Sequence, residues 1–326
     1  MIHLSGTLPA VDVHTHLAPL LSGEQLKLVG LTQHPDGRYA AAAAPLGPPA
    51  LYRERELLGY LDAQQLDEAL VAIAPPFFRQ DLDVEASASW VRAINDGLIA
   101  RCSASERLRP LRYLPLEHPA LAIELVREGL ASDECAGWAA AAGGAAAPLD
   151  GPELSELWSL LAADGRPLLL HPAESPDPRL RAHYLHNLLG NPVETGVAVG
   201  ELVLGGVLAQ HPMLRIILVH CGGVVPSVAA RWQRGIDTNR PGVTAGLPPV
   251  AEQLGRVFTD CLTHAAENVD LARTVFGDSQ LLLGSDWPFP IGLADPRTPI
   301  AHLDAELRER VARANPARLL SLVPAS

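Results

Sequence analysis

The sequence predicts an α/β protein, a (β/α)8 TIM barrel with long loops at the C-terminal face, formed as a single domain by residues 1–326. Eight short apolar runs recur along the chain, and stretches with helical spacing of apolar residues lie between them. The runs are apolar at consecutive positions, which is typical of parallel strands buried on both faces. A length of 326 residues also suits one α/β barrel.

The predicted strands occupy residues 11–13, 69–73, 111–114, 137–140, 168–170, 216–219, 257–260 and 281–283. The fourth consists mostly of alanine, which has little preference for β-structure, and a buried helical turn would show the same pattern. We include it because a closed barrel with eight repeats needs a strand at this place.

The predicted helices occupy residues 54–65, 85–100, 119–131, 151–164, 194–210, 225–233, 265–276 and 304–314. Residues 19–49, rich in glycine, proline and alanine, and residues 172–192 fall outside the repeat. Both segments follow predicted strands, and such loops lie on the C-terminal face of a barrel, where active sites are built. We therefore expect them to act as lids or to contact a ligand.

Charge and cysteine content restrict the partners and the compartment. The chain carries 25 basic and 37 acidic side chains, a formal net charge of −12, which argues against nucleic acid or an anionic membrane surface as the main partner. No apolar stretch reaches the roughly 20 residues of a membrane-spanning helix. The four cysteines are widely spaced without a CxxC pair, so we expect a reducing compartment and a cytoplasmic protein.

Five residues with metal-ligating or acid–base side chains lie at the ends of predicted strands. His14 and His16 lie two apart after the first strand, so both imidazoles point to the same side. His171, His220 and Asp286 end the fifth, sixth and eighth strands, and in a barrel all five converge on one mouth. The alternative is that His171 and His220 are buried and bonded to the backbone, and that Asp286 caps a turn. Each of these assignments is plausible singly, but much less so jointly.

Recognisable motifs surround these positions. They are residues 11–16 (VDVHTH), 171–172 (HP), 190–195 (GNPVET), 205–207 (GGV), 211–212 (HP), 220–223 (HCGG), 258–260 (FTD), 284–290 (GSDWPFP) and 315–320 (NPARLL). With these motifs the sequence resembles the amidohydrolase superfamily, in its decarboxylase-rich branch, over nearly its whole length. The ordered histidines and the GSDWP block are the most specific part of the resemblance.

The resemblance implies an enzyme with one divalent ion per subunit, Zn²⁺ or another divalent metal, bound by His14, His16, His171 and Asp286. Three imidazoles and a carboxylate suit the borderline-soft character of zinc. His220 is implied as the catalytic acid–base residue and not as a ligand. Residues 137–147 contain no lysine, so the carbamylated lysine of two-metal relatives has no evident donor, which favours a single ion.

The resemblance also implies nonoxidative decarboxylation of a small unsaturated or aromatic carboxylic acid by a homodimer. Arg231 matches a substrate-binding arginine that family members insert into the neighbouring subunit's site, although a solvated helix charge is the alternative. Other family positions differ here: Arg38 is the nearest candidate for a loop arginine, and two tryptophans are replaced by Ala173 and Asn187. We therefore predict a small-molecule carboxylate as the substrate class, without naming one acid.

Two other function classes remain open. A metal-dependent hydrolase of a lactone, amide or ester is the alternative function, because the same ion and base can activate water for attack on a carbonyl. A noncatalytic binding barrel would not need the complete set of histidines and Asp286 with a separate His220. Asp260, at the end of the seventh strand, is expected to hydrogen-bond a metal ligand or a nearby backbone amide.

Overall fold

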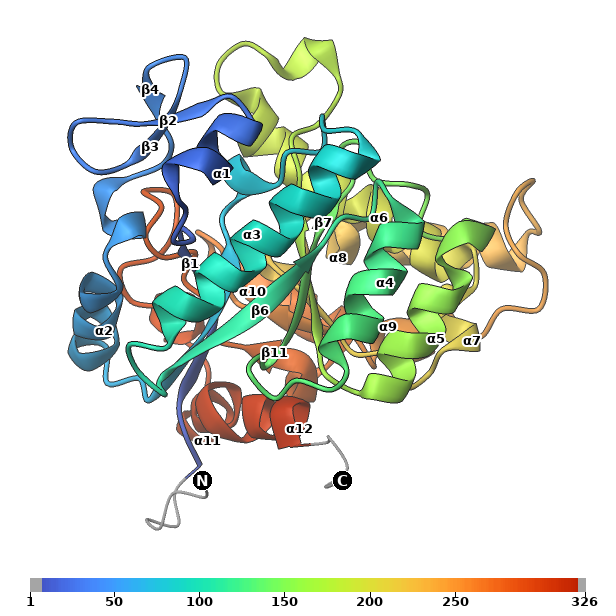
Figure 1. Cartoon of the computed structure of the whole chain (residues 1–326). Helices are drawn as coiled ribbons and strands as arrows, with labels where there is room; N and C mark the ends of the chain where they lie inside the picture. Colours follow the sequence, from blue (N-terminus) through green and yellow to red (C-terminus); the bar gives the residue numbers. More distant parts are fainter. Residues whose placement is uncertain (1–7, 322–326) are drawn as a thin grey trace.

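The computed structural model describes residues 8–321, in which eight parallel strands form a barrel (Figure 1). The strands are β1 (Val11–Leu17), β5 (Glu68–Ile73), β6 (Leu108–Leu114), β7 (Gly137–Ala142), β8 (Leu168–Pro172), β9 (Ile216–Leu218), β10 (Phe258–Asp260) and β11 (Leu281–Leu282). They follow one another around the barrel in chain order, as repeated strand–helix units require. The barrel closes where the Val13 amide donates to the Leu283 carbonyl (2.9 Å). The predicted fold class and all eight predicted strands are confirmed.

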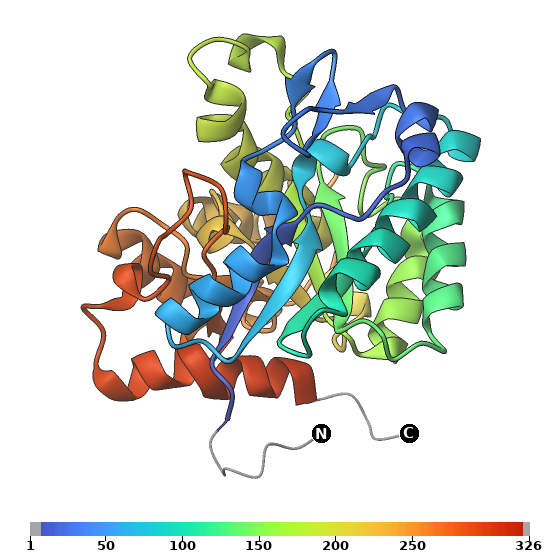
Figure 2. The same cartoon turned by 60° about the vertical axis from the view of Figure 1, so that its left-hand side comes forward.

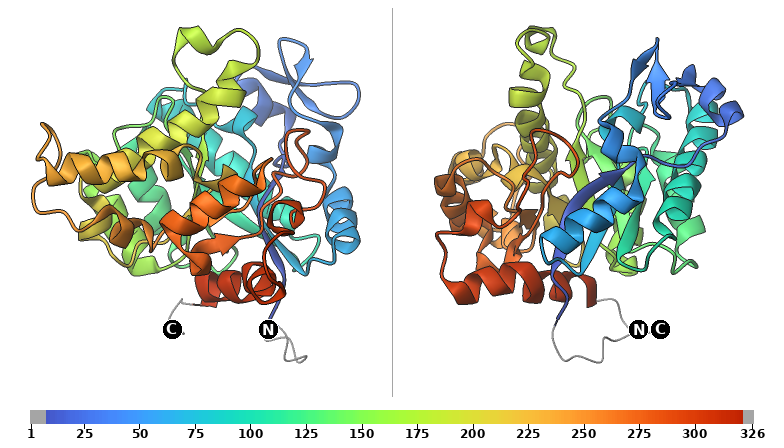
Figure 3. Two further views of the ribbon diagram at one scale, coloured as in Figure 1. Left: turned by 180° about the vertical axis from the view of Figure 1, so that it is seen from behind. Right: turned by 90° about the vertical axis from the view of Figure 1, so that its left-hand side faces the viewer.

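Helices cover the outside of the barrel, as the further views show (Figures 2 and 3). They are α2 (Glu54–Ala63), α3 (Val84–Cys102), α4 (Pro119–Gly129), α5 (Ser155–Asp164), α6 (Asn191–Leu204), α7 (Val207–Gln210), α8 (Val225–Asp237), α9 (Val250–Leu254), α10 (Ala266–Phe276), α11 (Ala305–Glu309) and α12 (Asn315–Ser321). Within residues 8–321, none is both long enough and apolar enough to cross a bilayer.

Three helical segments differ from the prediction. The segment 194–210 is divided into α6 and α7, because Gly206 adopts a left-handed φ of 89° between them. The segment 304–314 continues from α11 through a π-helical turn into α12. The sequence analysis missed α9, whose five residues are too few to display helical spacing.

Alternate side chains of the strands fill the inside of the barrel. In β5, Leu70 and Ala72 join the inner apolar cluster, whereas Val71 and Ile73 belong to the outer cluster that packs against the helices. Helix α12 crosses the end of the barrel where the strands begin (Figure 2), and its fully buried Leu319 joins the inner cluster. Apolar packing therefore closes this end, and the C-terminal ends of the strands form the other.

The two segments outside the repeat both rise above the C-terminal ends of the strands (Figure 1). Residues 172–192 contain a 3-10 turn at Pro178–Leu180 and a π-helical turn at His186–Gly190. Residues 19–49 contain α1 (Gly23–Leu28) and an antiparallel sheet of β2 (Leu31–Gln33), β3 (Tyr39–Ala41) and β4 (Ala44–Pro45). The sequence analysis missed this sheet, because strands of two or three residues show no periodicity.

Shortening Leu319 to alanine is expected to destabilise the barrel, because the change removes buried methyl groups from its closed end. The expected loss in the free energy of unfolding is about 2–5 kcal/mol. Leu28→Ala is the matched control: Leu28 is 63% exposed on α1, so its truncation is expected to cost less than about 0.5 kcal/mol. Denaturant unfolding measures the difference, and equal midpoints for the two variants would contradict the role of α12 in closing the barrel.

Candidate active site

All five predicted metal-ligating and acid–base residues meet at the C-terminal end of the barrel. His14 and His16 lie in β1 and His171 in β8, while His220 begins the 3-10 turn after β9 and Asp286 follows β11. The ring centroid of His14 lies 5.1 Å from that of His16, 5.3 Å from that of His171 and 5.1 Å from that of His220. Oδ1 of Asp286 lies 3.5 Å from Nε2 of His14 and 3.2 Å from Nε2 of His16, and its Oδ2 lies 3.8 Å from Nε2 of His220.

The donor atoms of this cluster fit a divalent cation. One group of four residues has ligand atoms that all lie within 4.8 Å of one another, and it consists of His14, His171, His220 and Asp286. His16 does not belong to this group, but its Nε2 lies 3.2 Å from Oδ1 of Asp286. Nε2 of His14, Nε2 of His171, both ring nitrogens of His16 and Oδ1 of Asp286 are buried without a hydrogen-bond partner. Buried polar atoms normally have partners, and a cation between these atoms would provide one.

Hydrogen bonds from the surrounding structure orient two of the imidazoles. Nδ1 of His14 donates to the buried carboxylate of Asp260 (2.8 Å), and Nδ1 of His171 donates to the Pro172 carbonyl (2.9 Å), so Nε2 of each ring keeps a lone pair. Asp260 also accepts hydrogen bonds from the backbone amides of His220 (3.2 Å) and Cys221 (2.8 Å). Asp260 thus makes both kinds of contact expected from its position after the seventh strand.

The backbone at the site is held in an unfavourable conformation. His220 and Asp286 have φ values of 56° and 59°, in the left-handed region that residues with a Cβ rarely adopt. The glycines that follow His220 permit close packing: a Cβ on Gly223 would lie 2.6 Å from the carbonyl oxygen of Pro192. Strain of this kind gathers at functional positions, where the surrounding contacts over-determine the backbone.

Burial and mutual interaction give the imidazoles different proton affinities. Burial lowers the pKa of His171 well below its ordinary value, with the neighbouring imidazoles adding to the effect, and burial also lowers the pKa of His14. Burial by itself would lower the pKa of His220, but the Asp286 carboxylate raises it above its ordinary value. Burial would likewise raise the pKa of Asp286, but the nearby imidazoles hold it well below its usual range. Burial therefore favours the neutral form of His14 and His171, which is the form that can bind a metal ion, whereas Asp286 favours the protonated form of His220.

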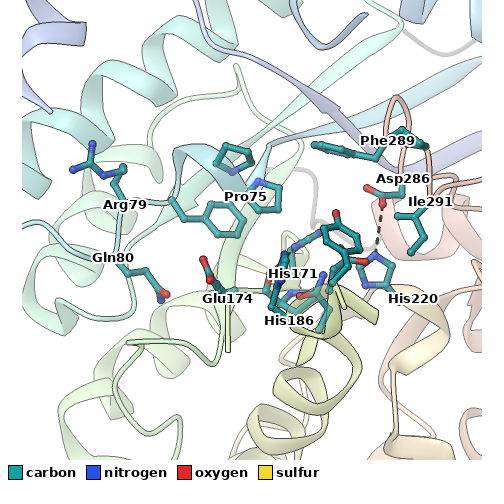
Figure 4. Close-up of a pocket in the computed structure, with 18 of the residues that line it drawn as sticks. Pro75, Arg79, Gln80, His171, Glu174, His186, His220, Asp286, Phe289 and Ile291 are labelled. Atoms are coloured by element: carbon teal, nitrogen blue, oxygen red, sulfur yellow. Dashed lines mark hydrogen bonds and ion pairs between the residues drawn. The ribbon is translucent and has the colours of Figure 1, made fainter. Parts of the chain in front are cut away.

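A cavity of about 830 Å³ opens at this cluster, with walls from the loops that follow the strands (Figure 4). His171, His220 and Asp286 line it, whereas His14 and His16 are fully buried and do not. Two phenyl rings stand beside the imidazoles: the centroid of Phe78 lies 6.0 Å from that of His171, and the centroid of Phe289 lies 5.5 Å from that of His16. The entrance to the cluster is therefore flanked by flat apolar surfaces.

The two long segments contribute unequally to the cavity. Residues 172–192 supply Ala173, Glu174, Tyr184, His186 and Asn187 among its lining residues, as expected of a loop that contacts a ligand. Residues 19–49 supply none of the described lining residues and fold instead into the small sheet above the C-terminal ends of the strands. A role of this segment as a lid or in ligand contact stays a prediction.

The predicted arginines do not line the cavity of their own chain. Arg231 is exposed on α8 and makes no hydrogen bond or ion pair with the described residues. Arg38 donates to the Asp36 carboxylate (2.6 Å) and to the Gly47 carbonyl (2.8 Å). A contact between Arg231 and a ligand would thus have to involve a second subunit.

Several lining residues were not identified from the sequence. Phe78, Arg79 and Gln80 follow β5, and Phe289 and Ile291 follow β11. Their position after strands was the available signal, because such loops build the mouth of a barrel. Which side chains of these loops face the cavity depends on loop conformation, which periodicity does not reveal.

The chain belongs to the amidohydrolase family, whose model matches residues 11–322. It is similar to the 2-amino-3-carboxymuconate-6-semialdehyde decarboxylase of Dictyostelium discoideum, with 31% identity over 147 residues, 44% of this chain and 41% of that protein. The Caenorhabditis elegans protein of that name is 33% identical over 129 residues, 38% of this chain and 32% of that protein. The gamma-resorcylate decarboxylase of Rhodococcus jostii (strain RHA1) is 25% identical over 290 residues, 81% of this chain and 86% of that protein. The chain thus spans less than half the length of the first two relatives.

Solved structures of similar proteins share the fold. The IDCase of Metarhizium anisopliae, solved in apo form, superimposes with a TM-score of 0.79 at 23% identity and covers 99% of both chains. A 5-carboxyvanillate decarboxylase of Novosphingobium aromaticivorans DSM 12444, solved with manganese, gives a TM-score of 0.77 at 18% identity over 97% of both chains. At such identities the similarity supports the barrel fold and does not extend to a substrate.

Asp260→Asn is expected to weaken divalent-ion binding by about 10- to 100-fold. An asparagine amide group would turn its NH2 toward one of the donors that now meet the carboxylate, so His14 would lose its fixed orientation. Competition titrations with a zinc chelator measure the dissociation constant. Asp96→Asn, at an exposed position of α3, is the control; the same dissociation constant for both variants would contradict a positioning role for Asp260.

Proposed function

We propose that this protein catalyses the metal-dependent, nonoxidative decarboxylation of a small unsaturated or aromatic carboxylic acid. The observation that carries the proposal is the cluster of unpartnered buried donor atoms at a cavity flanked by Phe78 and Phe289. Such rings favour a flat, unsaturated ligand. The curated relatives described above are decarboxylases, which supports this reaction over the hydrolysis of a lactone, amide or ester at the same cluster.

The proposed ligands of a single divalent ion are His14, His16, His171 and Asp286. Zinc suits three imidazoles and one carboxylate, and manganese is the alternative suggested by the solved relative. When bound, the ion would supply a Lewis acid that polarises an oxygen group of the substrate. All other parts of the chemistry fall to the side chains that line the cavity.

His220 is proposed as the acid–base residue. It lines the cavity with a side chain 16% exposed, and Asp286 raises its pKa, so its imidazole can hold and deliver a proton. Nε2 of His220 would donate this proton to the carbon that bears the carboxylate. The carbon–carbon bond would then break, its electron pair returning to the unsaturated system, and CO2 would leave.

We also propose that the protein acts as a homodimer, with Arg231 reaching the partner's cavity to bind an acid group. The support is that Arg231 is exposed and unpaired among the described residues, and that Arg79 is the only guanidinium among the described residues that line the cavity. We place the protein in the cytoplasm, because its four cysteines are buried and free.

Replacing His171 and His220 separately by alanine is expected to give different outcomes. His171→Ala loses the ion, because ligand number sets the affinity of such a site. His220→Ala keeps about one ion per subunit but loses roughly 10²- to 10⁴-fold in turnover, the usual contribution of acid–base catalysis. Elemental analysis and CO2 release from a panel of unsaturated and aromatic acids measure both. Stoichiometric metal in His171→Ala would refute its assignment as a ligand, and turnover of lactones or esters without CO2 release would favour the hydrolase.

Mixing two inactive variants tests the shared site. Arg231→Ala and His220→Ala are each expected to lose activity, yet subunit exchange should restore it in heterodimers, because one of the two cavities then has both native residues. A mixture of His220→Ala with tagged His220→Ala is the control and should stay inactive. Exchange demonstrated by co-purification of the tagged subunit without recovered CO2 release would reject the contribution of Arg231 across the dimer.

A further inference from the structure

The described part of the cavity wall has one guanidinium, and internal contacts already occupy it. Arg79 is the sole lysine or arginine among the described lining residues. Its Nε donates to Oδ1 of Asp81 (2.7 Å), its second terminal nitrogen donates to Oδ2 of the same carboxylate (2.8 Å), and its first donates to the Val29 carbonyl (2.5 Å). The two donors with which a guanidinium binds a carboxylate in a bidentate manner are therefore occupied by Asp81, and Arg79 cannot use them to bind a substrate carboxylate. Figure 4 shows the side chain turned away from the histidines.

One acidic side chain of the cavity lacks such a partner. Glu174 lies three residues after His171, is exposed, and makes no hydrogen bond or ion pair with the described residues. In the view of Figure 4 its carboxylate points into the space between Gln80 and His171. The cavity wall also carries the carboxylate of Asp81, which Arg79 holds, the imidazole of His186, and the uncharged amides of Asn187 and Asn191.

The backbone that carries Glu174 is well anchored although its side chain is exposed. Pro172 pairs with Ala142 at the end of β8, and the amide of Ala173 donates to the Ala142 carbonyl (2.9 Å). Ala173 is buried and packs against Gly144: a Cβ added to Gly144 would lie 2.8 Å from the methyl group of Ala173. Because the preceding residues are held in place, the backbone of Glu174 has a defined position on the wall beside His171.

We infer that this cavity selects acids with a single carboxylate and with a cationic substituent, such as an ammonium group, that meets Glu174. A second carboxylate at that edge would face Glu174 without a free lysine or arginine among the described lining residues, and two like charges in a partly enclosed cavity repel each other. The inference rests on the proposed function only in that the substrate's carboxylate lies at the metal end. An arginine from a second subunit would serve that same carboxylate.

Calorimetric binding of matched benzoates to the metal-loaded, full-length protein tests the inference without requiring turnover. The probes are 3- and 4-(aminomethyl)benzoate, the corresponding carbamoylbenzoates, and isophthalate and terephthalate, whose second groups are similar in size and are cationic, neutral and anionic in turn. The wild type should bind an aminomethyl probe more tightly than the dicarboxylate of the same ring position by on the order of 10-fold. Glu174→Gln should remove most of this preference, and Glu174→Lys should reverse it.

Glu153→Lys is the matched control, because Glu153 is exposed at the start of the α5 segment, away from the lining residues, and the variant has the same net charge as Glu174→Lys. It should keep the wild-type preference. The inference is overturned if the wild type binds the dicarboxylates equally well or better at both ring positions, if Glu174→Gln leaves the ratio unchanged, or if no probe binds. Assays of CO2 release separate the two proposals: a preference without CO2 release from any acid rejects decarboxylation alone, whereas CO2 release without a preference rejects the selectivity alone.

Discussion

Hydrogen bonds between β1 and the segment after β11 join the first and last strands of the barrel, and the same bonds bring the candidate site residues of the two segments together. The amide of Asp286 donates to the carbonyl of His14 (2.8 Å), and the amide of His16 donates to the carbonyl of Trp287 (2.8 Å). The barrel closes between Val13 and Leu283, and these two bonds continue the same pairing as far as the candidate metal ligands His16 and Asp286. Because closing a parallel sheet brings the C-terminal ends of its strands together, His171 is brought to the same place by β8. Loss of closure would therefore disperse the whole cluster.

Closure has an electrostatic cost, since it buries three carboxylates at one end of the barrel. Asp12 accepts hydrogen bonds from the His14 amide (3.0 Å) and the Tyr60 hydroxyl (2.9 Å), yet burial still raises the pKa of Asp12 to about 6. Asp260 is compensated by backbone amides and by an imidazole, while Oδ1 of Asp286 has no hydrogen-bond partner. Buried negative charge requires nearby positive charge, so cation binding would stabilise this end of the fold as well as prepare it for chemistry.

The strands and the loops contribute different parts of the candidate site. The metal-ligating candidates lie on or next to strands, where closure and buried hydrogen bonds set their positions. The cavity wall is built from loops, and its width follows from small residues such as Ala173 packed against Gly144. A tryptophan in place of Ala173 would collide with that glycine unless the loop moved. A family that keeps its strand ends and varies its loops can thus retain one reaction and change the acid it accepts.

The barrel, its eight strands and the residues that meet at its mouth could all be predicted from the amino-acid sequence. Continuous apolar runs are a local signal, and in a barrel the end of every strand faces the same way, so His14, His171 and Asp286 could be placed together from their positions after strands. The small sheet in residues 19–49, the occupied guanidinium of Arg79 and the carboxylate of Glu174, unpaired among the described residues, could be found only in the folded chain. These depend on how irregular loops fold over one another, and such contacts are set by long-range packing that leaves no period in the sequence.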